Sequence, residues 1–234
     1  MGGDPAQLLA FETTAVTGYQ IRARHRNEGV REVVPADYEG VLVTDRGRSY
    51  DAQELAGVRQ QKCLAHIQRS LSEVLAHQQG KARAFESRLK GLLRQAPDLW
   101  HDYHRGQRAG FAAQAPQLKE LITHHLRDRP LKDPDNRRLL NELGGHNDRG
   151  NLLRFLDDPR IEPTNNRAER ALRPAVIARK VSQCSKNAQG AQTFAVFTSV
   201  MRTLAKTGTG SLVDRLVHVF RSAKMPDASA EACP

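Results

Sequence analysis

The chain has 234 residues, a formal net charge of +10 and a pI of about 9.9, and this charge indicates a polyanionic partner, above all nucleic acid. The three cysteines are odd in number and far apart, which argues against a disulfide framework and for a reducing compartment, the bacterial cytoplasm. No run approaches the roughly 18 apolar residues that cross a bilayer, and no secretory pattern is found, so export and membrane insertion are excluded as expectations. The charge alone leaves open a solvated basic protein without a specific ligand.

The first part of the chain reads as short extended segments. Leu8 to Phe11, Val16 to Ile21 and Val41 to Val43 are separated by polar or Gly/Pro breaks, and Asn27 to Val34 predicts a short helix between the last two. The run Gly40 to Gly47 is typical of a buried parallel strand followed by a loop. These patterns predict an α/β fold.

Asp45 stands at the carboxyl end of that apolar strand, where α/β folds place their chemistry. An aspartate in this position can also simply cap the following turn. The sequence leaves both readings open for Asp45.

Helical periodicity begins at Ala65, after a short strand around Gln61 to Leu64, and dominates from Gly80 to Asp158. Apolar positions at helical spacing predict one helix after Pro116 and another that ends at Gly144-Gly145, a C-cap pattern. We expect residues 80–158 to form a helical module inserted between two parts of a core.

After this module, Thr164 or Asn165 can cap a helix that aligns Asn165, Glu169 and Arg173 on one face, and Pro174 is expected to kink or end it. Two amphipathic helices follow, the first closed by Gly208 and the second capped by Ser211. The tail from residue 226 is small and polar.

Many basic residues stand close to Glu169 in the sequence, and Glu169 is the single acidic residue among them. Such a cluster suits contacts to phosphate oxygens beside a metal, although a solvated basic helix and a Glu169–Arg173 ion pair are the structural alternatives. The candidate DNA-binding residues are Arg167, Arg170, Arg173, Arg179, Lys180 and Lys186.

Cys63, His66 and Arg69 form a further motif, which resembles part of a zinc site. A structural zinc site needs four ligands, and the sequence offers no second Cys/His pair at suitable spacing, so we reject zinc. No phosphate-binding glycine loop or nucleophile elbow is found either.

Together these segments resemble the catalytic region of the transposases of bacterial insertion sequence sixty-six, a family with a ribonuclease-H-like DDE core. The resemblance runs from about Leu8 to Ser222, and the Asn-Asn-x-Ala-Glu-Arg motif with its Arg-Pro sequel is its specific part. The matching segments, in the family's order, are Gly40 to Asp45 with Tyr50, Cys63 to Arg69, Asn165 to Pro174, and Arg179-Lys180.

The resemblance implies that Asp45 is the second catalytic aspartate and Glu169 the catalytic glutamate. It also implies Mg²⁺- or Mn²⁺-dependent cleavage and strand transfer at transposon ends, with two metal ions at the site. Cys63, His66, Arg69, Asn165 and Asn166 match family motifs without an assigned role.

One departure concerns the family's first aspartate, which lies on an opening strand upstream of the segment that matches Leu8 to Ile21. Asp4 is the only acid before that segment, and it does not follow an apolar strand. In a ribonuclease-H-like sheet the opening strand is central, so its loss would leave the strands around Val16 and Val41 without their shared partner. We therefore expect an N-terminally truncated copy whose activity is doubtful.

The expected domains are residues 1–79 as the first part of an incomplete ribonuclease-H-like core, 80–158 as the helical insertion, 159–225 as the second part with C-terminal helices, and 226–234 as a tail. The first hypothesis is a transposase that acts on transposon-end DNA near the nucleoid. The second is a non-catalytic DNA-binding or oligomerising remnant that acts with itself or with full-length transposase. The third is a nuclease that rebuilt its metal site with Asp37 or Asp51.

Overall fold

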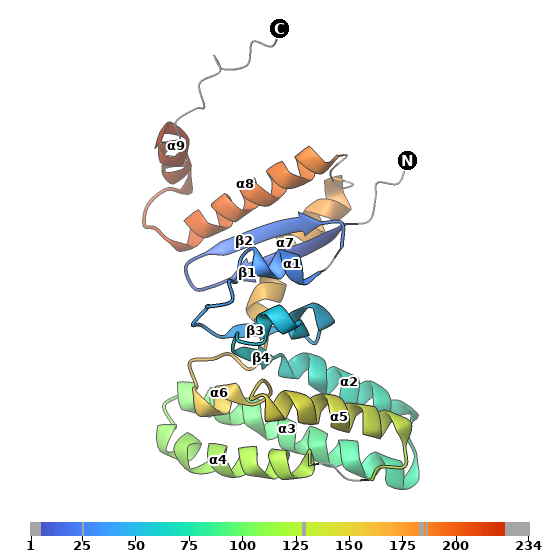
Figure 1. Cartoon of the computed structure of the whole chain (residues 1–234). Helices are drawn as coiled ribbons and strands as arrows, with labels where there is room; N and C mark the ends of the chain where they lie inside the picture. Colours follow the sequence, from blue (N-terminus) through green and yellow to red (C-terminus); the bar gives the residue numbers. More distant parts are fainter. Residues whose placement is uncertain (1–5, 25, 128–129, 183–184, 186, 223–234) are drawn as a thin grey trace. The chain divides into compact units, whose positions relative to one another are not determined.

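A computed structural model of the chain describes residues 6–24, 26–127, 130–182, 185 and 187–222. The chain is mixed α/β and mostly helical, as Figure 1 shows. It divides into two compact units, Met1–His25 with Arg167–Pro234, here called the hairpin unit, and Arg26–Asn166, here called the helical unit.

The hairpin unit is built on an antiparallel pair of strands, β1 (Gln7–Glu12) and β2 (Thr17–Arg22). Leu9 and Tyr19 supply its buried side chains, and the turn is fastened by Thr13, whose Oγ1 accepts from the Val16 amide at 2.9 Å. Three helices complete the unit. They are α7 (Asn166–Ser182), which begins at the unit boundary, α8 (Ala188–Lys206) and α9 (Leu212–Ser222).

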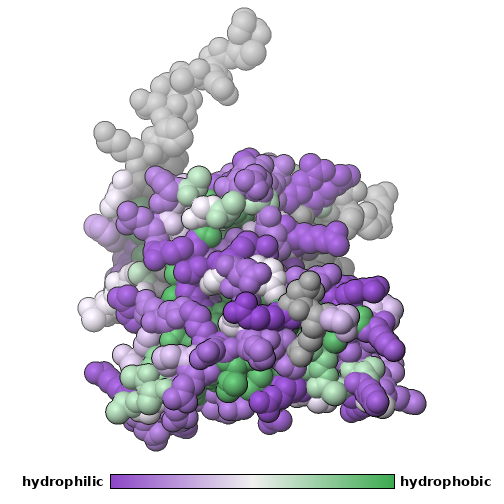
Figure 2. All heavy atoms as spheres, turned by 60° about the horizontal axis from the view of Figure 1, so that its bottom comes forward, coloured by the Kyte–Doolittle hydropathy of each residue, from purple (hydrophilic) through white to green (hydrophobic). Residues whose placement is uncertain are grey.

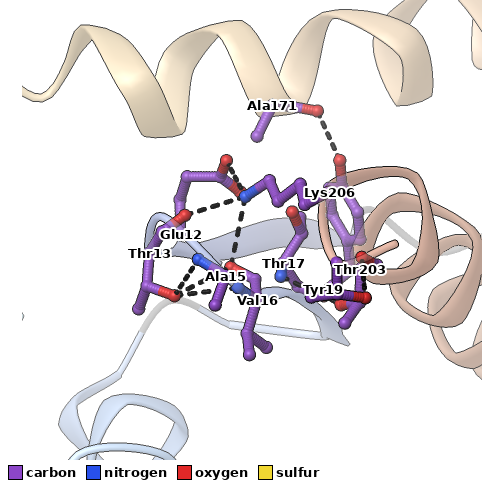
Figure 3. A network of polar contacts seen from close by, with 10 residues as sticks. Glu12, Thr13, Ala15, Val16, Thr17, Tyr19, Ala171, Thr203 and Lys206 are labelled. Atoms are coloured by element: carbon purple, nitrogen blue, oxygen red, sulfur yellow. Dashed lines mark hydrogen bonds and ion pairs between the residues drawn. The ribbon is translucent and has the colours of Figure 1, made fainter. Parts of the chain in front are cut away.

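Hydroxyl groups of α8 bind the outer edge of β2. Thr203 Oγ1 accepts from Thr17 N at 3.0 Å and donates to Thr17 O at 3.1 Å, and Ser199 Oγ accepts from Tyr19 N at 2.8 Å. Lys206 pairs with Glu12, and Figure 3 shows this network together with the Tyr19 hydroxyl, which donates to Ala171 O of α7 at 2.5 Å. Because unpaired strand edges leave polar backbone groups unsatisfied, these side chains act for β2 as a neighbouring strand would.

The helical unit begins with α1 (Asn27–Arg31) and a parallel pair of strands, β3 (Leu42–Thr44) and β4 (Gln60–Lys62). The strands are joined by two short 3₁₀ turns, η1 (Arg48–Asp51) and η2 (Gln53–Leu55). The predicted parallel strand before Asp45 is therefore confirmed, although only its last residue, Thr44, is buried.

Five helices and one turn make up the rest of this unit. They are α2 (Leu64–His77), η3 (Gly80–Ala82), α3 (Arg83–His104), α4 (Arg108–His125), α5 (Pro134–Asp148) and α6 (Arg154–Asp157). Leucine and phenylalanine side chains from all five helices form one continuous core. On the face turned forward in Figure 2, hydrophilic side chains predominate and hydrophobic ones reach the surface in separate patches.

The predicted helix end at Gly144-Gly145 is wrong. α5 runs on to Asp148 and is followed by Gly150, whose φ of +67° is the left-handed conformation that commonly terminates helices. Gly144 serves packing instead, because a Cβ there would lie 3.1 Å from the carbonyl oxygen of Leu126. Gly144 thus reflects a close approach to the backbone of Leu126 and not a cap.

Three prolines lie inside the described helices, namely Pro97 in α3, Pro116 in α4 and Pro174 in α7. α4 begins at Arg108 and passes through Pro116, so the predicted start after that proline is wrong, and α7 continues past Pro174 to Ser182 instead of ending there. Each proline removes one backbone hydrogen bond. The residues next to two of these prolines, Ala115 in α4 and Ala175 in α7, are buried, so both helices are packed at these points.

The described strands form two separate two-stranded sheets, β1-β2 in the hairpin unit and β3-β4 in the helical unit. A single ribonuclease-H-like sheet that contains all four strands therefore stays a proposal. In the part of the chain that the structure describes, no helix has the length and apolar character needed to cross a membrane.

Candidate functional site

Asp45 follows β3 directly and is half-buried in the helical unit. One of its oxygens, Oδ1, accepts a hydrogen bond from Gly47 N at 2.7 Å, so the turn-capping role that the sequence left open is realised for this oxygen. A Cβ at Gly47 would lie 2.9 Å from Oδ1, so a side chain at this position would displace the Asp45 carboxylate. The backbone after Asp45 is thus fitted closely around its carboxylate.

The turn η1 continues this arrangement and is fastened to β4. Tyr50 N donates to Gly47 O at 3.1 Å, and Tyr50 O accepts from the Gln60 side chain at 2.7 Å. Burial, and then the charge of Asp45, raise the pKa of Tyr50 to about 12. Tyr50 therefore stays a neutral phenol beside Asp45.

Lys62, the last residue of β4, is fully buried, and sequence reasoning missed it. Its Nζ lies 2.9 Å from Asp51 Oδ1 and 5.8 Å from the centre of the Tyr50 ring. A lysine in a short polar strand gives no sequence signal of burial. Because Asp51 is paired with Lys62, the hypothesis of a metal site rebuilt on Asp51 is weakened. Asp37, the other acid of that hypothesis, is exposed.

His146 of α5 is a second buried residue of this region that the sequence did not single out. Its Nδ1 lies 3.0 Å from the Arg149 guanidinium, which can only donate, so Nδ1 accepts. Burial lowers the pKa of His146, and Lys62 and Arg149 lower it further, against the opposing charges of Asp51 and Glu142. His146 is therefore neutral near pH 7.

The Cys63 motif lies at the junction of β4 and α2, beside the end of β3. Cys63 is buried with a free thiol, and its amide donates to Thr44 O at 2.7 Å. The next amide, Leu64 N, donates to Pro163 O at 3.0 Å. The start of α2 therefore joins the strand that carries Asp45 to the segment that leads into the Glu169 helix.

His66 is half-buried one turn into α2, and Arg69 is exposed on the same helix. Among the described residues, no three His, Cys, Asp or Glu side chains form a group that could hold a metal ion.

Glu169 lies half-buried in the first turn of α7. It belongs to the hairpin unit, whereas Asp45 belongs to the helical unit, so their meeting at one site stays a prediction. At about 100° per residue, Glu169, Arg173 and Lys180 lie within about 40° of one another around the helix axis.

The structure describes four of the six candidate DNA-binding side chains. Arg170, Arg173 and Lys180 are exposed along α7, and Arg167 is half-buried. The side chain of Arg179 and the whole of Lys186 lie outside the described residues, as does Asp4.

Helix α7 begins at Asn166, so Asn165 stands at the predicted cap position, but its side-chain oxygen does not make the predicted capping hydrogen bond with any described residue. This oxygen, Oδ1, is buried. An amide oxygen without a donor, one turn before Glu169, is a suitable ligand for a hard cation.

A model of the Transposase IS66 family matches residues 6–193, which include Asp45, the Cys63 motif and Glu169. The chain belongs to this family. It is a transposase by family, and the resemblance inferred from its motifs is confirmed. Searches of curated proteins and of solved structures found no match for the chain.

The matched residues include the whole helical unit and, from the hairpin unit, β1, β2, α7 and the start of α8, so the helical segment between Asp45 and Glu169 lies inside the family match. Lys62 and His146 are two buried ionisable residues of the helical unit that the fold reveals.

Proposed function

We propose that this IS66-family protein takes part in metal-dependent cleavage and strand transfer at insertion-sequence ends, with Asp45 and Glu169 as two of its catalytic carboxylates. In the first step water attacks phosphorus and the bond to the 3′ oxygen breaks, which leaves a 3′-hydroxyl. In the second step that hydroxyl attacks a target phosphodiester and displaces another 3′ oxygen. The observation that carries the proposal is the family match across both acidic motifs.

The surroundings of Asp45 support this role. Asp45 emerges from a parallel strand into a loop whose backbone holds one oxygen, Oδ1, and thereby orients the whole carboxylate. The bond between Leu64 N and Pro163 O brings the segment six residues before Glu169 to the same end of β3 and β4. Both features suit a site assembled from these two motifs.

The oxygen donors present fit Mg²⁺ or Mn²⁺. Asp45 and Glu169 would supply carboxylate oxygens, and Asn165 Oδ1, which is buried and has no donor among the described residues, would add an amide oxygen. When bound, such ions supply Lewis-acid activation of the attacking oxygen and stabilisation of the leaving oxygen. A further aspartate, which the family resemblance places on a strand before Leu8, would complete the ligand set.

The exposed cations of α7 support a DNA-binding role. Arg170, Arg173 and Lys180 line the helix that carries Glu169, where they would contact phosphates next to the scissile bond. Arg167, Arg179 and Lys186 are proposed to extend this contact.

The experiment is a cleavage and strand-joining assay on DNA that carries the ends of the element, with and without Mn²⁺. We expect metal-dependent products from the wild-type protein and a loss of at least about 100-fold in Asp45→Asn and Glu169→Gln, because each removes a metal ligand. Glu120→Gln is the matched control, since Glu120 is an exposed glutamate on α4.

The alternative function is a non-catalytic DNA-binding or oligomerising remnant. It predicts binding to the same DNA with a steep salt dependence, no effect of metal, and equal behaviour of wild type, Asp45→Asn and Glu169→Gln. That outcome would replace the catalytic proposal.

A further inference from the structure

We propose that Lys62 is a positioning residue for Asp45, because its buried ammonium fixes the turn η1 and through it the orientation of the Asp45 carboxylate. The proposal rests on the proposed function for its consequence, the alignment of a metal ligand. Its geometry concerns the helical unit alone.

The burial of Lys62 needs a reason. A fully buried ammonium loses its hydration, and an ion pair in the interior is often no more stable than apolar residues of the same volume. What such a pair supplies is a fixed geometry, since the charged partner must stay in place. Here the partner is Asp51, the last residue of η1, at 2.9 Å.

A continuous chain of contacts leads from Lys62 to Asp45. The ammonium holds Asp51 and lies over the Tyr50 ring, the Tyr50 amide donates to Gly47 O at 3.1 Å, and Gly47 N donates to Asp45 Oδ1 at 2.7 Å. The turn therefore cannot shift at Asp51 without moving the donor that orients the Asp45 carboxylate.

The backbone register places Lys62 where it can act in this way. Lys62 pairs with Thr44 across the parallel strands, and Thr44 immediately precedes Asp45. On the other side, Arg46 makes a two-pronged contact with Glu142 of α5, with both distances at 2.6 Å. The strand end is thus held from both sides, by Lys62 through η1 and by Glu142 through Arg46.

Neutral His146 agrees with this arrangement. A second positive charge beside Lys62 would weaken the hold on Asp51, and the accepted hydrogen bond from Arg149 keeps the imidazole uncharged. The region therefore keeps one buried cation opposite one carboxylate.

The test measures the Gly47 amide in the full-length protein by nuclear magnetic resonance. In Lys62→Met we expect a changed Gly47 amide shift and at least about tenfold faster hydrogen exchange there, because the turn is released. The amide of Thr17, in the hairpin unit, should not change. Lys119→Met is the matched control, since Lys119 pairs with Asp157 at 2.6 Å on the surface of the same unit.

An unchanged Gly47 amide in a folded Lys62→Met protein would overturn the proposal. If Lys62→Met does not fold, the shift and hydrogen exchange of the Gly47 amide are measured in Asp51→Asn instead, with the same expected result. Loss of fold in both variants would show that the ion pair stabilises the whole unit and has no specific role for Asp45. No metal is needed for this readout. Failure of wild type to bind Mn²⁺ would count against the proposed function and leave the result for Lys62 intact.

Discussion

Glu86 of α3 is a fully buried carboxylic acid far from the catalytic motifs along the chain. Burial, and after it the charges of Asp133 and Asp135, raise the pKa of Glu86 to about 7 against the opposing effect of the Gln78 side chain. The unfolded chain loses this proton near pH 4.5, so the folded state binds more protons between that pH and about 7. Stability should therefore fall as the pH rises through this window.

We expect the unfolding free energy of Glu86→Gln, relative to that of wild type, to rise by about 2.5 kcal/mol between pH 5 and pH 8. Urea denaturation at both pH values measures it, with Glu120→Gln as the exposed control. A difference between wild type and Glu86→Gln that does not depend on pH would mean that Glu86 titrates normally in the folded protein.

Gly47 is expected to be indispensable for Asp45. In Gly47→Ala the new Cβ would lie 2.9 Å from Asp45 Oδ1 and 3.3 Å from the Tyr50 ring, so the carboxylate must move. We predict at least about fivefold weaker Mn²⁺ binding, measured by electron paramagnetic resonance of free Mn²⁺, because a displaced ligand loses its geometry.

The same substitution at Gly91 is the control, since a Cβ there meets nothing within 4 Å on α3. Gly91→Ala should leave Mn²⁺ binding unchanged and stabilise the helix by about 0.5–1 kcal/mol. Equal Mn²⁺ affinities of the two variants would disprove the role given to Gly47.

At the scale of elements, α8 protects the edge of β2 through Ser199 and Thr203. The double variant Ser199→Ala/Thr203→Val leaves the amides of Thr17 and Tyr19 without their side-chain acceptors. This loss should lower the unfolding free energy by about 2–4 kcal/mol. Hydrogen exchange at these two amides should accelerate accordingly. Thr193→Val, at an exposed position of α8, should have no such effect, and unchanged protection in the double variant would refute the edge contact.

The elements also show what could be predicted from the sequence. The strand before Asp45 was predictable because an apolar run followed by an acid and a glycine is a local signal. The continuation of α5 through Gly144 and of α7 through Pro174 was not, because tertiary packing outweighs the local preference of these residues. Local patterns therefore located most elements but not their ends.

The same limit applies to the candidate site. Asp45 and Glu169 could be proposed as site residues because both stand in sequence motifs that resemble the IS66 family, and both lie within the matched range. Lys62 and His146 could not, because their burial depends on contacts between β4, η1 and α5, which are distant in sequence. A charged residue in a strand ordinarily indicates exposure.

For the whole molecule, the net charge of +10 predicts binding to DNA that weakens steeply with salt. If Arg170 and Arg173 each contact a phosphate, Arg170→Gln/Arg173→Gln should reduce the slope of log K against log salt by about 2. Arg94→Gln/Arg137→Gln, which removes the same charge from exposed positions of the helical unit, is the control. Equal slopes for the two double variants would indicate nonspecific attraction only.

The central claim is that Asp45 and Glu169 bind one metal site, and Mn²⁺-induced broadening of amide resonances tests it most directly. We predict that Mn²⁺ broadens the amides of Gly47 and Arg170 over the same concentration range, and that Asp45→Asn abolishes the broadening at both. Persistence of the Arg170 broadening in Asp45→Asn would contradict the shared site.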